Sequence, residues 1–184
     1  MNKIILLDRD GVINQDRPDY IQTTEQLILI PGSAAAIGRL SRAGYKVLII
    51  TNQACIGKGL VSIATLTAIH QLISQAVEKE GGTIDQFYFC PHHPDDGCPC
   101  RKPKPGMIIN AQKDWGFDLK NTWMVGDAVR DMEAASAAGC KTAIVRTGKG
   151  EESAATLPAL AAFDNLAHFV SFLLDDNPAP SETF

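Results

Sequence analysis

KIILLDRDGVIN, at residues 3–14, joins a short apolar run to a cluster of acidic side chains. The residues ahead of Asp8 are mostly Ile and Leu without polar alternation, which is typical of a strand buried on both faces of a sheet. Similar apolar runs recur along the chain and alternate with helical patterns. This alternation predicts an α/β protein with a central parallel sheet covered by helices on both faces.

The expected strands and helices follow one another along the chain. Strands are predicted at 3–8, 46–51, 84–90, 122–125 and 142–145. Helices are predicted at 33–43, 62–79, 105–115, 128–138 and 163–174. One domain over residues 1–174 is expected, and residues 175–184 are expected to form a disordered tail. Ligands in such a fold bind beyond the carboxyl ends of the strands.

Composition and charge narrow the class of protein. The chain has 184 residues, a formal net charge of −4 and a pI of about 5.5, which argues against a broad nucleic-acid-binding surface. The apolar run before Asp8 is too short for a signal peptide, and no stretch has the length of a membrane span. We therefore expect a cytoplasmic location, with neither a membrane nor a nucleic acid as partner. The odd number of cysteines, five, argues against a disulfide framework.

Two carboxylates follow the first strand directly, at Asp8 and Asp10. One carboxylate in such a pair can attack phosphorus, and the other can protonate the leaving oxygen and then deprotonate water. Two anions facing a phosphate need a counter-ion, and Mg²⁺ prefers hard oxygen ligands of this kind. A solvated acidic turn is the competing interpretation of an isolated D-x-D motif.

Three further motifs follow in order and supply partners for this chemistry. They are Thr51-Asn52-Gln53 at the end of a strand, Lys102-Pro103, and Gly126-Asp127 with Asp131 one helical turn later. Taken singly, Thr51 fits a cap, Lys102 a solvated cation and Asp127 a helix N-cap. All four motifs near predicted strand ends are improbable as coincidence, so we expect one phosphoryl-transfer site.

Residues 90–100, CPHHPDDGCPC, place three thiols and two imidazoles in one loop. A tetrahedral site made of Cys90, His92, Cys98 and Cys100 would be closed, so the expected zinc ion is structural. His93 is the alternative histidine ligand; reduced thiols or a disulfide are the alternative to a metal site. The two other cysteines are expected to pack as small apolar residues.

The four motifs in this order resemble those of the haloacid dehalogenase superfamily of phosphohydrolases, over most of the chain. The resemblance implies a Rossmann-like three-layer fold. It implies Asp8 as nucleophile, Asp10 as general acid and base, and Thr51 and Lys102 as groups that stabilise the phosphoryl group. It also implies Mg²⁺ bound by the Asp8 carboxylate, the Asp10 main-chain carbonyl and Asp127. Asp131 is then expected to orient Lys102 or a metal ligand.

The cysteine loop limits the resemblance to a smaller group of phosphatases within the superfamily. Cys-x-His, then Cys-x-Cys running into Arg-Lys-Pro, is similar to the family of D-glycero-D-manno-heptose-1,7-bisphosphate 7-phosphatases and histidinol-phosphate phosphatases. This resemblance implies that Arg101 recognises substrate and that Asn52 and Gln53 lie in a substrate-binding segment. Asp16 and Tyr20 fall in a short polar loop that contacts substrate in this family.

A small phosphorylated sugar is the expected substrate. The segment between the first two motifs encodes one helix plus loops, so no large cap domain fits there. The expected reaction removes the 7-phosphate of D-glycero-D-manno-heptose 1,7-bisphosphate through an aspartyl-phosphate, and we expect a monomer. Histidinol-phosphate phosphatase and a non-catalytic zinc-stabilised binding module remain as alternatives. The acidic net charge disfavours a polynucleotide 3′-phosphatase. Thr147–Gly150 lacks the P-loop spacing and is expected to be a loop, with a position near the site as one option.

Overall fold

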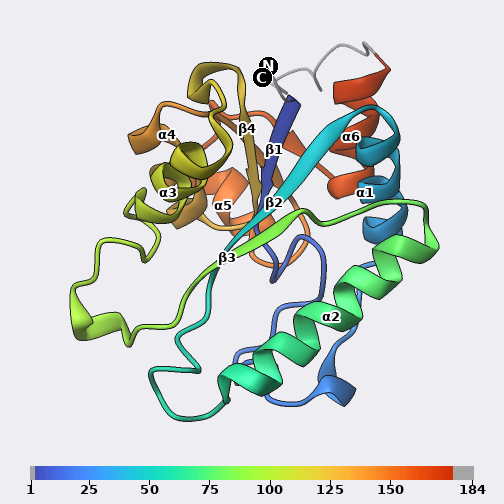
Figure 1. The fold of residues 1–184 in the computed structure, drawn as a ribbon. Helices are drawn as coiled ribbons and strands as arrows, with labels where there is room; N and C mark the ends of the chain where they lie inside the picture. Colours follow the sequence, from blue (N-terminus) through green and yellow to red (C-terminus); the bar gives the residue numbers. More distant parts are fainter. Residues whose placement is uncertain (1–2, 176–184) are drawn as a thin grey trace.

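A computed structural model describes residues 3–175 and shows one twisted sheet between two layers of helices (Figure 1). The strands are β1 (Lys3–Leu7), β2 (Tyr45–Asn52), β3 (Gln86–Cys90), β4 (Trp123–Gly126), β5 (Lys141–Val145) and β6 (Ala162–Phe163). The α-helices are α1 (Ser33–Arg42), α2 (Ile63–Lys79), α3 (Gly106–Trp115), α4 (Val129–Ala138), α5 (Gly150–Thr156) and α6 (Leu166–Leu174). Short 3₁₀ turns lie at Thr24–Gln26, Pro94–Asp96 and Leu119–Asn121.

The sheet has the strand order β3-β2-β1-β4-β5-β6, and all neighbouring strands are parallel. The chain runs outward from β1 to β3 and then returns to the other side of β1 to place β4. The strand order therefore reverses at β1 and β4, which is where α/β folds form a crevice for ligands. The predicted α/β class and parallel sheet are confirmed, without a large cap domain between β1 and α1.

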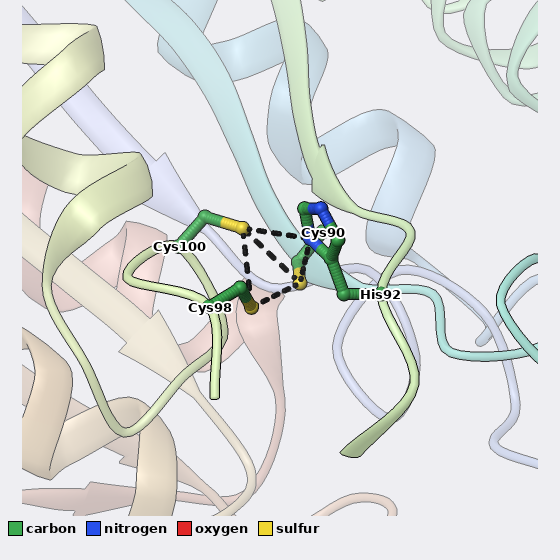
Figure 2. Close-up of side chains that lie close together, drawn as sticks. All are labelled: Cys90, His92, Cys98 and Cys100. Atoms are coloured by element: carbon green, nitrogen blue, oxygen red, sulfur yellow. Dashed lines mark hydrogen bonds between the residues drawn. The ribbon is translucent and has the colours of Figure 1, made fainter. Parts of the chain in front are cut away.

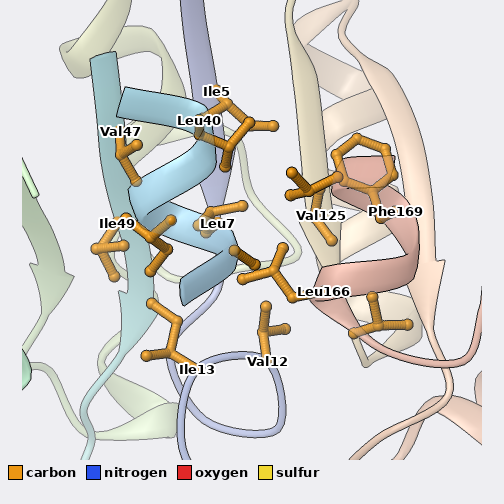
Figure 3. Close-up of a cluster of buried hydrophobic side chains, with 14 of the residues drawn as sticks. Ile5, Leu7, Val12, Ile13, Leu40, Val47, Ile49, Val125, Leu166 and Phe169 are labelled. Carbon is orange, nitrogen blue, oxygen red and sulfur yellow. The ribbon is translucent and has the colours of Figure 1, made fainter. Parts of the chain in front are cut away.

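Alternation along the strands divides the core into two apolar layers. Figure 3 shows the layer beside α1 and α6. Ile5 and Leu7 of β1 face the layer that contains α1 and α6, whereas Ile4 and Leu6 face the layer that contains α3 and α4. Side chains of a strand point alternately to the two faces of a sheet, so a strand without polar alternation needs cover on both sides. All four of these side chains are buried, which explains the unbroken apolar run before Asp8.

The structure differs from the predicted elements most at the C-terminal end. Phe163, expected to start a helix, pairs in β6 with Val145, and α6 begins at Leu166 after the Asn165 side chain accepts the His168 main-chain N–H at 2.9 Å. β6 and α5 were not expected from the sequence, because a two-residue strand and a short helix with little apolar periodicity give weak signals.

The C-terminal boundary of the expected tail also differs in part. Asp175, placed in the tail by the sequence, forms an ion pair with Arg39 of α1 at 2.9 Å. The remainder of the predicted tail, 176–184, lies outside the described residues. Across residues 3–175, none of the helices combines the length and apolar character needed to cross a lipid bilayer.

Candidate active site

The acidic motifs meet at the carboxyl ends of β1 and β4. Asp8 follows β1 and donates its main-chain N–H to Val125 O of β4 at 2.9 Å, and Asp127 follows β4 directly. Because neighbouring parallel strands end at the same edge of the sheet, motifs more than a hundred residues apart in sequence become adjacent. Carboxylate oxygens of Asp8, Asp127 and Asp131 lie within 4.8 Å of one another.

These three carboxylates are almost completely withdrawn from solvent, with 3%, 1% and 0% of the Asp8, Asp127 and Asp131 residue surfaces exposed. Burial, and then the charge of Asp131, raises the pKa of Asp8 well above its usual value. Burial raises the pKa of Asp127 to about 6. Carboxylates packed this tightly repel one another, so a cation among them would stabilise the ionised forms.

Lys102 is the protein's own counter-charge to this cluster. Its Nζ lies 3.0 Å from Asp8 Oδ1, 2.7 Å from Asp131 Oδ1, and 2.7 Å from the Ile50 carbonyl oxygen to which it donates. The ammonium group thus donates to one carbonyl oxygen and forms ion pairs with two buried carboxylates. Asp131 thus lies against Lys102, as expected, and its other oxygen accepts the Ala128 N–H at 3.0 Å.

The loop after β5 orients Asp127. The Lys149 main-chain N–H donates to Asp127 Oδ2 at 2.8 Å, while Asp127 Oδ1 is buried and has no hydrogen-bond partner among the described residues. A Cβ at Gly148, where φ is +60°, would collide with this carboxylate, as would a Cβ at Gly11. The Thr147–Gly150 loop therefore lies at the site, and the unpartnered oxygen is the kind of atom that a metal ion would bind.

Asp10 has a different environment from the other carboxylates. Its oxygens accept two hydrogen bonds from Arg9 Nη2, at 2.8 and 3.0 Å, and one each from Asn14 Nδ2 and Gln53 Nε2, both at 2.9 Å. Burial alone would raise the pKa of Asp10, but the Arg9 charge and these donors lower it below its usual value. Arg9 itself is 1% exposed, and its Nη1 lies 3.3 Å from Nε2 of the buried His70.

The side chains of the Thr51-Asn52-Gln53 motif point in two directions: Thr51 and Gln53 lie beside Asp10, and Asn52 bonds the main chain of Lys102. Thr51 and Gln53 point to the same side of the chain, as residues two apart in extended backbone do, and Gln53 Nε2 donates to Thr51 Oγ1 at 2.8 Å. Both side chains are buried, and in the free protein they lie beneath the cleft rather than on its walls. Asn52 does line the cleft, and its side-chain amide donates to Lys102 O and accepts from Lys102 N, both at 3.0 Å.

A cleft of about 310 Å³ opens over Asp8 and Asp10. Among the residues expected to bind substrate, Asp16, Tyr20 and Arg101 line it together with Asn52. Arg130 and Lys149 also line the cleft and were not identified from the sequence. Arg130 lies one residue before Asp131 in the fourth motif, but the direction of a helical side chain cannot be deduced from a motif alone.

The cysteine loop forms a separate cluster, drawn in Figure 2. The Cys90, Cys98 and Cys100 Sγ atoms lie 3.3–3.6 Å apart, and His92 Nδ1 lies 3.5 Å from Cys90 Sγ and 3.2 Å from Cys100 Sγ. A tetrahedron with metal–sulfur bonds of about 2.3 Å has edges of roughly 3.6–3.8 Å, close to these separations. His93 is not in the cluster; its Nδ1 accepts the Asp95 N–H at 3.3 Å and caps the next turn.

Comparison with known proteins connects this geometry to a family. The HAD-hydrolase-like family model matches residues 99–169. The D-glycero-beta-D-manno-heptose-1,7-bisphosphate 7-phosphatase of Pseudomonas aeruginosa is 46% identical over 173 residues, covering 93% of this chain and 97% of that protein. The chain belongs to this family of HAD-like phosphatases. Another member with the same name, from Neisseria meningitidis serogroup B, is 42% identical over 97% of the chain and 98% of its own length.

A solved structure of a family member has the same fold. The crystal structure of the D,D-heptose 1,7-bisphosphate phosphatase of B. bronchiseptica, complexed with magnesium and phosphate, superposes with a TM-score of 0.92 at 40% identity. The match covers 95% of this chain and 99% of that one. The HAD-like family and the three-layer Rossmann-like fold expected from the sequence are thereby confirmed.

Proposed function

We propose that this phosphatase hydrolyses the 7-phosphate of D-glycero-β-D-manno-heptose 1,7-bisphosphate and leaves the 1-phosphate. The observation that carries the proposal is the convergence of Asp127 and Lys102 on Asp8, which lines a cleft whose walls carry further cations. Such a site can hold a phosphate ester against a carboxylate and compensate its charge. Family membership supports the choice of substrate, because the relatives named above act on this sugar bisphosphate.

Asp8 and Asp10 divide the chemistry. An Asp8 oxygen attacks phosphorus to form an aspartyl-phosphate, and Asp10 in its protonated form gives a proton to the departing sugar oxygen. The Arg9 charge and the amide donors favour the ionised form of Asp10 in the free enzyme, so substrate has to bind to the fraction that carries the proton. Asp10 then takes a proton from the water that attacks phosphorus, which releases phosphate and restores the Asp8 carboxylate. Asp10 has the access this requires, because it lines the cleft beside Asp8. Lys102 holds Asp8 in place throughout, through its 3.0 Å contact.

The residues at the base of the cleft fit a magnesium ion. Asp8 and Asp127, with the Asp10 main-chain carbonyl, would hold it, and the buried, unpartnered Oδ1 of Asp127 is available as a ligand. Bound Mg²⁺ would neutralise phosphoryl charge between these carboxylates. Asp131 is a weaker candidate ligand because its oxygens already contact Lys102 and the Ala128 N–H.

The proposed function is tested by a phosphate-release screen. The heptose bisphosphate, histidinol phosphate and fructose 1,6-bisphosphate are compared with Mg²⁺ present, and kcat/KM is measured for each. We expect the heptose bisphosphate to have the highest value. A preference for histidinol phosphate would replace the proposed substrate, and no turnover of any phosphate ester would favour a binding module.

Weakened magnesium binding is expected when Gly148 is replaced by Ala. The added Cβ would displace the Asp127 carboxylate, and removal of such orienting contacts lowers metal affinity by about 10- to 100-fold. Isothermal titration calorimetry with Mg²⁺ and with Mn²⁺ measures the change. Gly116→Ala is the matched control, because Gly116 also has positive φ (+62°) but open space around its Cβ position. Equal metal affinity in both variants would show that the absence of a side chain at position 148 is not needed to keep the Asp127 carboxylate in its metal-binding position.

We propose in addition that Cys90, His92, Cys98 and Cys100 bind a structural zinc ion. Elemental analysis by mass spectrometry should find about one zinc per chain, since four protein ligands complete a tetrahedral site. Cys98→Ser should lower this content and reduce Tm, whereas Cys140→Ser, which alters a cysteine outside the cluster, should retain zinc. Zinc-free wild-type protein with an unchanged Tm would refute the assignment.

A further inference from the structure

Two arginines in the cleft lack protein partners. The chain has seven arginines, all within the described range. Five make side-chain hydrogen bonds or ion pairs: Arg9, Arg17, Arg39, Arg42 and Arg146. Arg101 and Arg130 have no such contact among residues 3–175, and both line the cleft over Asp8.

The two unpartnered guanidinium groups are partly enclosed. Arg101 Nη1 and Arg130 Nε are buried and have no acceptor among the described residues. A buried N–H without an acceptor is unfavourable and uncommon in folded proteins. Both side chains also line the cleft without a carboxylate partner in the described part of the chain, which indicates an anionic ligand between the two guanidinium groups.

The other cations of the site are already engaged. Lys102 forms ion pairs with Asp8 and Asp131 and donates to the Ile50 carbonyl oxygen, and Lys149 Nζ lies 3.5 Å from Asp16 Oδ2. A sugar bisphosphate brings two phosphate groups, each with a charge of nearly −2 at neutral pH. The attacked group has Lys102 and the proposed magnesium ion beside it, but the second group still needs compensation.

We propose that Arg130 is a specificity-determining residue that, together with Arg101, binds the phosphate group that is not cleaved. This proposal rests on the proposed function, because only a bisphosphate presents a second phosphate. Two guanidinium groups match one phosphate in charge, and each can donate two parallel hydrogen bonds to its oxygens. Arg130 lies in the first turn of α4, which begins at Val129. Burial acts to lower the pKa of Arg130, but the negative charges of Asp8, Asp131, Asp127 and Asp16 raise it.

The experiment measures selectivity in wild-type protein, Arg130→Gln, Arg130→Lys and the control Arg39→Gln. Arg39 is paired on α1 with Asp175 and does not line the cleft. For each protein, kcat and KM are determined with the heptose 1,7-bisphosphate and with the heptose 7-phosphate, which lacks the second phosphate. Circular dichroism and Tm establish that each variant is folded.

Arg130→Gln should lower the ratio of the two kcat/KM values at least tenfold, mainly through KM for the bisphosphate. Arg130→Lys should fall between this variant and wild type, because it keeps the charge but loses the paired hydrogen bonds. Arg39→Gln should keep the wild-type ratio. An unchanged ratio in Arg130→Gln, even with both substrates slowed equally, would overturn the proposal while leaving the function intact. A wild-type enzyme that turns over both substrates equally would also overturn the proposal, whereas a wild-type enzyme that releases no phosphate from the bisphosphate would refute the proposed function, and this proposal with it.

Discussion

Asp8→Asn is expected to lower kcat at least about a thousandfold, because the amide cannot attack phosphorus as a carboxylate does. The fold should survive, since Asn is nearly isosteric and removes one charge from a crowded acidic cluster. The measurements are phosphate release, Tm and zinc content. In wild-type protein, rapid acid quenching during turnover should trap a phosphorylated chain, and peptide mass spectrometry should place the phosphate on Asp8.

Asp164→Asn is the matched control for this variant, because the same change is made at an exposed carboxylate outside the cleft. It should leave kcat within the error of the wild-type value. If Asp8→Asn keeps activity comparable to wild type, the aspartyl-phosphate mechanism is wrong, whatever substrate is used.

Lys102→Met should both abolish activity and destabilise the fold. Removal of the ammonium group leaves Asp8 and Asp131 buried without their shared counter-charge. Breaking a buried pair in this way typically costs about 3–5 kcal/mol, which for a chain of this size corresponds to a fall in Tm of roughly 6–20 °C. Thermal unfolding followed by circular dichroism, without added Mg²⁺, measures the change.

A second substitution separates the charge effect from loss of packing. Lys102→Met combined with Asp131→Leu removes one of the two stranded carboxylates and should recover part of the lost Tm while remaining inactive. Lys79→Met, on the exposed last turn of α2, serves as the control and should leave Tm nearly unchanged. A Lys102→Met protein as stable as wild type would show that the ammonium group does not hold the acidic cluster together.

The sheet, the pairing of its acidic motifs and the make-up of the cysteine cluster were all predictable from short patterns in the sequence. The strand before Asp8 was predictable because both of its faces are buried, and its polar end therefore had to lie at the sheet edge. The meeting of Asp8 with Asp127 followed from the rule for strand ends in parallel sheets. His92, and not His93, lies with the three cysteines, as the symmetry of the two ligand pairs indicated.

The unpredicted features depend on directions that sequence spacing does not encode. Gln53 packs behind Asp10, although the two-residue period shared with Thr51 offered a signal that these side chains point the same way. Arg130 reaches the cleft because α4 begins at that point, and Lys149 does so because its loop folds back over β4. Long side chains and loop paths such as these are determined by tertiary packing.

Two features restrain the main chain at Lys102: hydrogen bonds from the Asn52 side chain and the nearby cysteine cluster. Asn52 pairs with both of its main-chain polar groups, and the cysteine cluster ends at Cys100, only two residues earlier. A free lysine side chain carries about 2 kcal/mol of rotamer entropy, yet here its tip is also tied to the Ile50 carbonyl oxygen. The entropy of this lysine is therefore lost once, when the chain folds, and arriving substrate meets an ammonium group that is already ordered.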